Sequence, residues 1–209
     1  TLDLAVRDRR ISVRGKLNFD LDGSYNFASR RFTVAALFNR TDLAPYLSAA
    51  GRKNLGGTVT GTVRAEGSAR APDRAALDIR LSQLELVSAG ERLVASSRFD
   101  ARMAGGTLVI PGIRLALLDD GWVRISGGGN IDRALNISLD SAVPLHLANR
   151  FTNNLTNFTG TLAARGGIRG TRSHPQISAD VTLDTIGFSI PSIGNEVREM
   201  NGRISFTPE

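Results

Sequence analysis

The side chains that could carry out catalysis or bind a metal are few and widely separated. His146 and His174 are about 30 residues apart and the chain has no cysteine, so neither has the partners of a zinc site. Asp119–Asp120 precede Gly121 between two apolar runs, which predicts a turn and not an acid–base pair. The glycines at 127–129 are followed by no lysine and no helix, unlike a phosphate loop. We therefore expect no enzyme, no metal and no cofactor.

The elements around these residues alternate apolar and polar residues with a period of two. Runs of five to nine residues end at Gly, Asp, Asn or Pro, a pattern typical of antiparallel strands with one apolar and one wet face. The sequence therefore predicts an all-β fold. The positions expected to line one apolar surface are Val59, Val63, Leu77, Ile79, Leu81, Phe99, Met103, Ile113, Leu115, Leu117, Val123, Ile125, Leu135, Ile137, Leu139, Leu162, Val181, Leu183, Ile186, Phe188, Ile204 and Phe206.

Two segments depart from this alternation and predict short helices. They are residues 41–54, in which Leu43 and Leu47 have helical spacing, and residues 144–155, in which Leu147 and Phe151 do. Asp42 is the expected N-cap of the first helix.

The two helical segments delimit an internal repeat. Gly61 and Gly67 after the first segment match Gly160 and Gly166 after the second, each 99 positions apart. The repeat divides the chain into the tail of one unit (1–42), a complete unit (43–143) and an incomplete one (144–209). A unit that cannot bury its own apolar face stacks on its neighbours, so we expect one elongated domain.

A single curved sheet accounts for the composition better than a sandwich does. Aromatic residues make up only 6% of the chain, with one Trp, whereas sandwich cores use aromatic anchors. We predict a half-pipe, or β-taco, with its aliphatic face inside and short helical turns at the seams. Its natural guest is an acyl chain, because each buried methylene contributes about 0.8 kcal/mol.

The charge of the chain does not predict nucleic-acid binding. All but two of the 26 basic residues are arginines, and the formal charge is +6. Arg64, Arg80, Arg102, Arg114 and Arg124 alternate with the aliphatic residues and are scattered over many strands. A sheet that binds RNA would place aromatic and basic residues on the same face. We therefore interpret the arginines as a solvated outer face.

The last unit resembles the C-terminal repeats of the TamB/AsmA-like family. The resemblance rests on Gly160-Thr-Leu-Ala-Ala-Arg-Gly166, on Pro175-Gln-Ile177 and on Asp180-Val-Thr-Leu183. It continues through Gly187-Phe-Ser-Ile190-Pro191 and through Asn201-Gly202-Arg-Ile-Ser-Phe206. These are repeat patterns, and the family has no catalytic residues to carry over.

The resemblance implies a periplasmic protein, anchored in the inner membrane of a diderm bacterium, that moves phospholipid acyl chains to the outer membrane. It also implies an outer-membrane β-barrel partner of the BamA/TamA type. No run reaches the ~18 apolar residues of a membrane-spanning helix, so the anchor is expected upstream. Two alternatives stay open: a stalk or adhesin-type repeat with a self-packed core, and a soluble periplasmic carrier of lipid or lipopolysaccharide.

Overall fold

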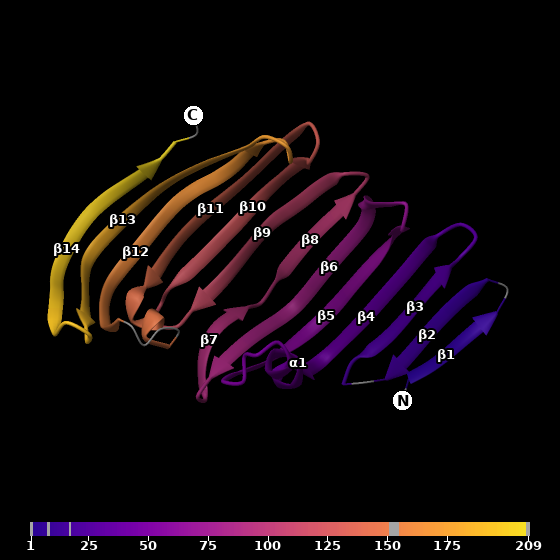
Figure 1. The fold of residues 1–209 in the computed structure, drawn as a ribbon, viewed down its shortest axis with the longest axis horizontal. Helices are drawn as coiled ribbons and strands as arrows, with labels where there is room; N and C mark the ends of the chain where they lie inside the picture. Colours follow the sequence, from indigo (N-terminus) through magenta and orange to yellow (C-terminus); the bar gives the residue numbers. More distant parts are fainter. Residues whose placement is uncertain (1, 8, 17, 151–154, 208–209) are drawn as a thin grey trace.

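One continuous antiparallel sheet contains all fourteen strands of the described chain (Figure 1). The structure is a computed structural model that describes residues 2–7, 9–16, 18–150 and 155–207. The predicted all-β, antiparallel fold is confirmed. The strands are β1 (Leu2–Arg7), β2 (Arg10–Lys16), β3 (Asp20–Asn26), β4 (Arg31–Asp42), β5 (Leu55–Ser68), β6 (Ala71–Ser88), β7 (Glu91–Ser96), β8 (Phe99–Ala104), β9 (Thr107–Leu117), β10 (Trp122–Asn130), β11 (Ala134–Pro144), β12 (Thr156–Gly170), β13 (Pro175–Ile190) and β14 (Asn195–Phe206).

The strands follow one another across the sheet in chain order, with one exception. β7 and β8 share a single position between β6 and β9, because β7 pairs with residues 84–88 of β6 and β8 pairs with residues 77–81. Ser96 ends β7, and its buried hydroxyl lies 3.0 Å from the Arg114 carbonyl of β9 and 2.9 Å from the Arg98 carbonyl. This side chain therefore connects the break between β7 and β8 to β9.

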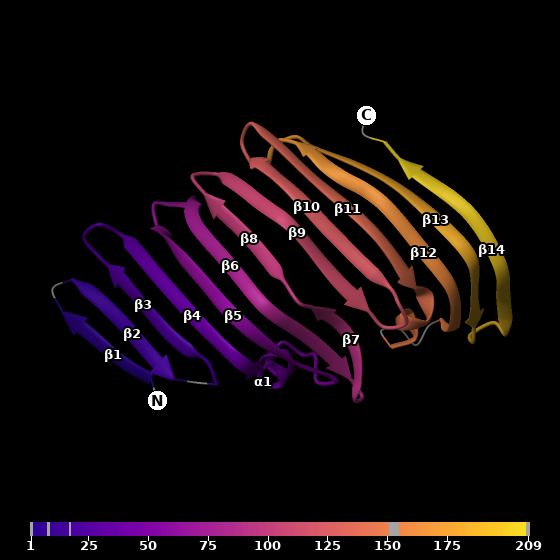
Figure 2. The same ribbon diagram turned by 180° about the vertical axis from the view of Figure 1, so that it is seen from behind.

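Two short helices lie beside strand ends on the same side of the molecule, one after β4 and one after β11 (Figures 1 and 2). The α-helix α1 (Ala44–Ala49) joins β4 to β5, and the 3-10 helix η1 (Leu145–Arg150) follows β11. Both fall inside the segments predicted to be helical, 41–54 and 144–155, although residues 151–154 of the second lie outside the described residues. We refer to α1 and η1 as the seam helices.

The predicted N-cap of α1 is wrong. The N-cap is Leu43, which makes no side-chain capping bond. Asp42 is still the last residue of β4, paired with Thr58, and this pairing holds its backbone in the ladder. Its Oδ1 accepts a hydrogen bond of 2.9 Å from the Ala44 backbone N–H, so it stabilises the turn before the helix.

Gly61 and Gly160, one matched pair of the internal repeat, lie at irregularities of the ladders. The pairing of β5 with β4 shifts between Phe38 and Thr41, and Phe38 lies opposite Gly61. The pairing of β5 with β6 shifts between Thr60 and Gly61. Gly160 of β12 lies where the register with β13 shifts. Bulges of this kind bend strands and increase their twist, so both glycines occupy bends.

The sheet is a single layer, and few of its side chains are fully buried. The buried hydrophobic residues among those described are Val59, Leu93, Ile113, Leu147 and Ile186. In Figures 1 and 2 no second sheet covers the described strands. A sandwich would bury one face of every strand, whereas here many apolar side chains keep contact with solvent.

Candidate functional site

The register of β6 and β8 brings predicted apolar residues directly opposite one another. Leu77 lies opposite Met103, and Leu81 lies opposite Phe99. Ile79 projects between Leu77 and Leu81, two residues from each. Directly opposed residues of antiparallel strands project to the same side of a sheet. These five residues therefore share one side, which we call the apolar side.

The same relationship continues through β9, β10 and β11. Ile125 lies opposite Ile113 on one neighbouring strand and opposite Leu139 on the other, and Leu115 lies opposite Val123. Each of these residues was predicted from the alternation. The remaining predicted residues of the first eleven strands pair as Val59 with Leu84, Val63 with Ile79, Leu117 with Val94, Ile137 with Gly127 and Leu135 with Gly129.

The last three strands extend the apolar side to the C-terminal edge. Leu162 of β12 lies opposite Leu183 of β13, and Val181 lies opposite Ile204 of β14. The other pairs are Phe206 with Ala179, Ile186 with Met200 and Phe188 with Val197. Every predicted residue thus has an apolar residue or a glycine opposite it. That they bind lipid stays a prediction.

Sequence reasoning missed the contribution of β4 to the apolar side. Val34, Ala36 and Phe38 lie opposite Ala65, Val63 and Gly61 of β5. The alternation was hidden because Ala35 and Leu37, which project to the other side, are also apolar. Leu37 lies opposite Asp20 and Thr62 and is 48% exposed. A signal was nevertheless present in the spacing of Phe32, Val34, Ala36 and Phe38.

The opposite side of the sheet, which we call the polar side, carries ion pairs within and between strands. Asp78 of β6 binds two guanidinium groups, Arg80 of the same strand at 2.7 Å and Arg102 of β8 at 3.4 Å. Asp140 of β11 pairs with Arg165 of β12 at 3.6 Å. These charges are partly or largely exposed, so solvent screens each pair and its stabilising effect is small.

Two arginines on the polar side have an aromatic partner instead of a carboxylate. Arg114 of β9 and Arg124 of β10 lie directly opposite each other. Their guanidinium carbons are 5.6 and 5.7 Å from the centre of the Trp122 ring. Like charges in opposed positions repel, and the electron-rich ring face offsets part of that repulsion. The sequence alone did not indicate this arrangement.

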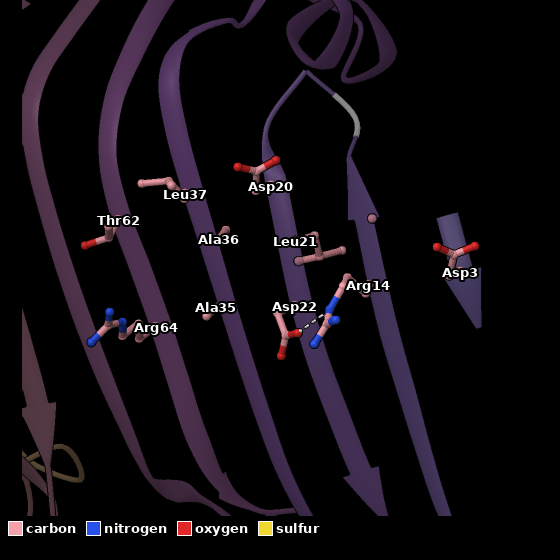
Figure 3. Close-up of a pocket in the computed structure, with 11 residues that line it drawn as sticks. Asp3, Arg14, Asp20, Leu21, Asp22, Ala35, Ala36, Leu37, Thr62 and Arg64 are labelled. Carbon is pink, nitrogen blue, oxygen red and sulfur yellow. Dashed lines mark hydrogen bonds and ion pairs between the residues drawn. The ribbon is translucent and has the colours of Figure 1, made fainter. Parts of the chain in front are cut away.

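A depression of about 510 Å³ on the polar side lies over β1–β5 (Figure 3). Figure 3 shows Arg14 of β2 pointing toward Asp22 of β3, and their ion pair measures 3.2 Å. Asp3, Asp20 and Arg64 complete its charged lining. Arg14 and Asp22 are 83 and 62% exposed, so these groups are solvated and lack the desolvated setting that tunes catalytic carboxylates.

A second hollow, which we call the seam cavity, lies on the apolar side and has a volume of about 450 Å³. Every described residue that lines it is Leu, Val, Pro or Ala. Its floor includes Leu86, Val94 and Leu117, which lie in one row across β6, β7 and β9. Leu55 bounds it after α1, and Leu147 bounds it within η1. Its lining therefore comes from four separate parts of the chain.

The residues considered for chemistry occupy turns and the second seam. Asp119 and Asp120 form the turn between β9 and β10, both with positive φ. His174 lies in the turn before β13, and His146 lies in η1. In the described ranges, no three metal-binding side chains of His, Asp or Glu gather. Across those same ranges, no helix has the length and apolar character needed to cross a bilayer.

Comparison with known proteins adds no identification. No family model, no curated protein and no solved structure matches this chain.

Proposed function

We propose that this chain is a segment of a lipid-conducting half-pipe in a bacterial envelope protein of the TamB/AsmA-like type. Its apolar side holds phospholipid acyl chains, and its polar side faces the aqueous periplasm. The whole protein is anchored in the inner membrane and passes lipid to the outer membrane, where a β-barrel of the BamA/TamA type is its partner.

The observation that carries this proposal is the series of opposed apolar residues that runs across the strands from β4 to β14. Side chains on this side remain accessible: Leu139 is 36% exposed, and Phe206 is 55% exposed. Exposed apolar surface on this scale is rare on a soluble monomer unless it binds something. Figures 1 and 2 show that β12–β14 curve along their length, and in the proposed half-pipe the apolar side is the concave one.

The chemistry of this surface suits an acyl chain. The backbone groups of the inner strands are paired within the sheet, and the apolar side chains offer no hydrogen bonds. A hydrocarbon needs none, and burying it contributes about 25 cal/mol for each Å² removed from water. Because aliphatic residues repeat on strand after strand, neighbouring positions have similar affinity and a chain can slide between them.

Photo-crosslinking from two adjacent residues tests the proposal. A benzophenone amino acid at Leu115 projects to the apolar side, whereas one at Arg114 projects to the polar side. With the protein expressed in the periplasm of a diderm host, we expect phospholipid adducts from position 115 and none from position 114. The two sites share a strand, so the comparison controls for expression and folding.

Two outcomes contradict the proposal. Equal adducts from both positions indicate nonspecific contact with membranes. Protein–protein adducts alone from position 115 favour the stalk alternative, in which the apolar side packs against other protein.

A further inference from the structure

The seam cavity differs from the rest of the apolar side because a helix, η1, lines it together with the strands. The backbone N–H of Leu118 donates to the Leu93 carbonyl at 3.1 Å, which joins the end of β9 to β7. Leu93 is buried at 5% exposure, and Leu147 of η1 is buried at 8%. A smaller apolar hollow of about 280 Å³ lies over β2–β4 and is lined by strands alone, whereas strand ends and a seam helix together line the seam cavity.

The hollow owes part of its shape to a glycine. Gly121 is buried between Leu117 and Pro144, two residues that line the cavity. A Cβ at this position would lie 2.5 Å from Pro144 Cδ and 3.0 Å from Leu117 Cβ. The Gly121 carbonyl accepts a 2.7 Å hydrogen bond from the Leu117 N–H. Glycine therefore lets the β9–β10 turn close against Pro144 without a side chain between them.

His146 places η1 against the β9–β10 turn. Its Nε2 lies 2.7 Å from Asp119 Oδ2 in that turn. His146 stands between Leu145 and Leu147, both of which line the cavity. The imidazole therefore faces the turn while the two neighbouring leucines line the hollow.

The other seam is closed by aromatic residues. Tyr46 of α1 packs against Phe19, with ring centres 5.9 Å apart, and Phe19 packs against Phe38 at 5.1 Å. The Tyr46 hydroxyl hydrogen-bonds the Asn18 side chain. Among the described residues, those that line the cavity beside η1 are all aliphatic. The described parts of the two seams thus differ in the side chains that pack against the helix.

A wholly aliphatic lining restricts what can occupy the cavity. A peptide would bring backbone N–H and C=O groups, and burying each without a partner costs about 1–3 kcal/mol. None of the lining side chains in the described part of the chain offers such a partner. A hydrocarbon carries no such penalty, and a volume of about 450 Å³ is within the usual range of ligand sites.

We propose that the seam cavity is a binding station for the methyl end of a single acyl chain, with the lipid headgroup left outside. This inference rests on the proposed function and goes beyond it: the strands of the apolar side let a chain slide, whereas the helix-lined cavity retains its end. Lipid movement along the sheet is then stepwise, with one resting place at the seam between the units 43–143 and 144–209.

Binding of cis-parinaric acid, a fluorescent fatty acid, to the 209-residue chain tests the station. Ala148→Phe fills the cavity from η1, whereas Ala101→Phe adds the same bulk on the open apolar side opposite Ile79. We expect Ala148→Phe to weaken binding at least fivefold and Ala101→Phe to leave it within twofold. Circular dichroism and the thermal midpoint establish that both variants fold. If Ala148→Phe does not fold, Leu93→Ala, which enlarges the cavity, is expected to alter affinity for the probe.

The possible results separate this inference from the proposed function. If the two substitutions weaken probe binding equally, or if neither weakens it, the binding station is overturned and a general lipid-binding surface remains. Absence of binding to the unaltered chain overturns both. Sedimentation velocity identifies another occupant: a dimer that dissociates in Ala148→Phe, with probe binding unchanged, shows that a second copy fills the cavity.

Discussion

Ser205 of β14 donates a 2.6 Å hydrogen bond to the Asp180 carboxylate of β13, directly across the last strand pair. Arg203 approaches the same carboxylate at 3.2 Å. The Ser205 hydrogen bond first, and then Arg203, lower the pKa of Asp180 below its ordinary value of 3.8. The outermost strand is therefore held partly by an ionised side chain on the polar side.

This arrangement predicts that attachment of β14 weakens in acid. Because the pKa of Asp180 is lower in the folded state, its contribution is complete above the ordinary value and disappears as the pH falls through the lowered one. Asp180→Asn should lower the thermal midpoint at pH 7 and have no effect near pH 2. Asp184→Asn is the control, because the Asp184 carboxylate accepts its hydrogen bond from the adjacent Thr185 and not from β14. An Asp180→Asn effect that persists unchanged in acid contradicts the assignment.

Gly61 should tolerate no side chain. Its φ is +147°, and a Cβ would lie 2.3 Å from the Arg80 carbonyl oxygen of β6. Gly61→Ala is expected to reduce the free energy of unfolding by about 1–3 kcal/mol. Urea denaturation measures the change. Gly23→Ala is the matched control, because its nearest atom, the Thr33 carbonyl oxygen, is 3.5 Å away. Equal effects of the two substitutions would contradict the bulge as their cause.

Charges on the apolar side should separate folding from lipid binding. Leu139 is 36% exposed and Ile113 is 3% exposed, although both lie opposite Ile125. Leu139→Asp should cost less than about 2 kcal/mol of stability and abolish lipid adducts from a photoreactive residue at position 115. Ile113→Asp buries the new charge and should cost several kcal/mol, on the order of a core polar substitution. If Leu139→Asp unfolds the chain as Ile113→Asp does, the surface is a packed core.

Trp122 should report the two arginines beside it. It is the only tryptophan, so it supplies all of the tryptophan fluorescence. Iodide is attracted to the positive charges around it. We expect Arg114→Gln to lower the Stern–Volmer constant for iodide and to leave that for neutral acrylamide unchanged. Glu85→Gln, on the polar side of β6, is the control. A parallel fall for both quenchers would mean that the substitution buries the ring and that charge is not the cause.

The sequence predicted side-chain direction and helix position correctly where a single periodicity runs through a short segment. Period-two alternation identified the apolar residues of β6, β8 and β9, because each strand there separates aliphatic from charged residues. Helical spacing likewise located α1 and η1 within the correct segments. In both cases the signal lies within a short stretch of chain, where side-chain direction follows from position alone.

Other features depend on contacts that a single stretch does not encode. Residues 34–38 are apolar on both sides of β4, so their direction follows only from pairing with β5. The Trp122 site requires the β9–β10 register to bring Arg114 and Arg124 together. The seam cavity joins Leu55, Leu86 and Leu147, which are far apart in the sequence and meet only in the folded sheet.

The interruption between β7 and β8 lies beside the irregularity in β6: Leu84 faces Ser96, and Leu81 faces Phe99. Two adjacent strand positions are therefore irregular at the same height. In the proposed half-pipe, backbone tilt along this line would set the bore as well as side-chain size does, and one lining would then accommodate guests of different thickness.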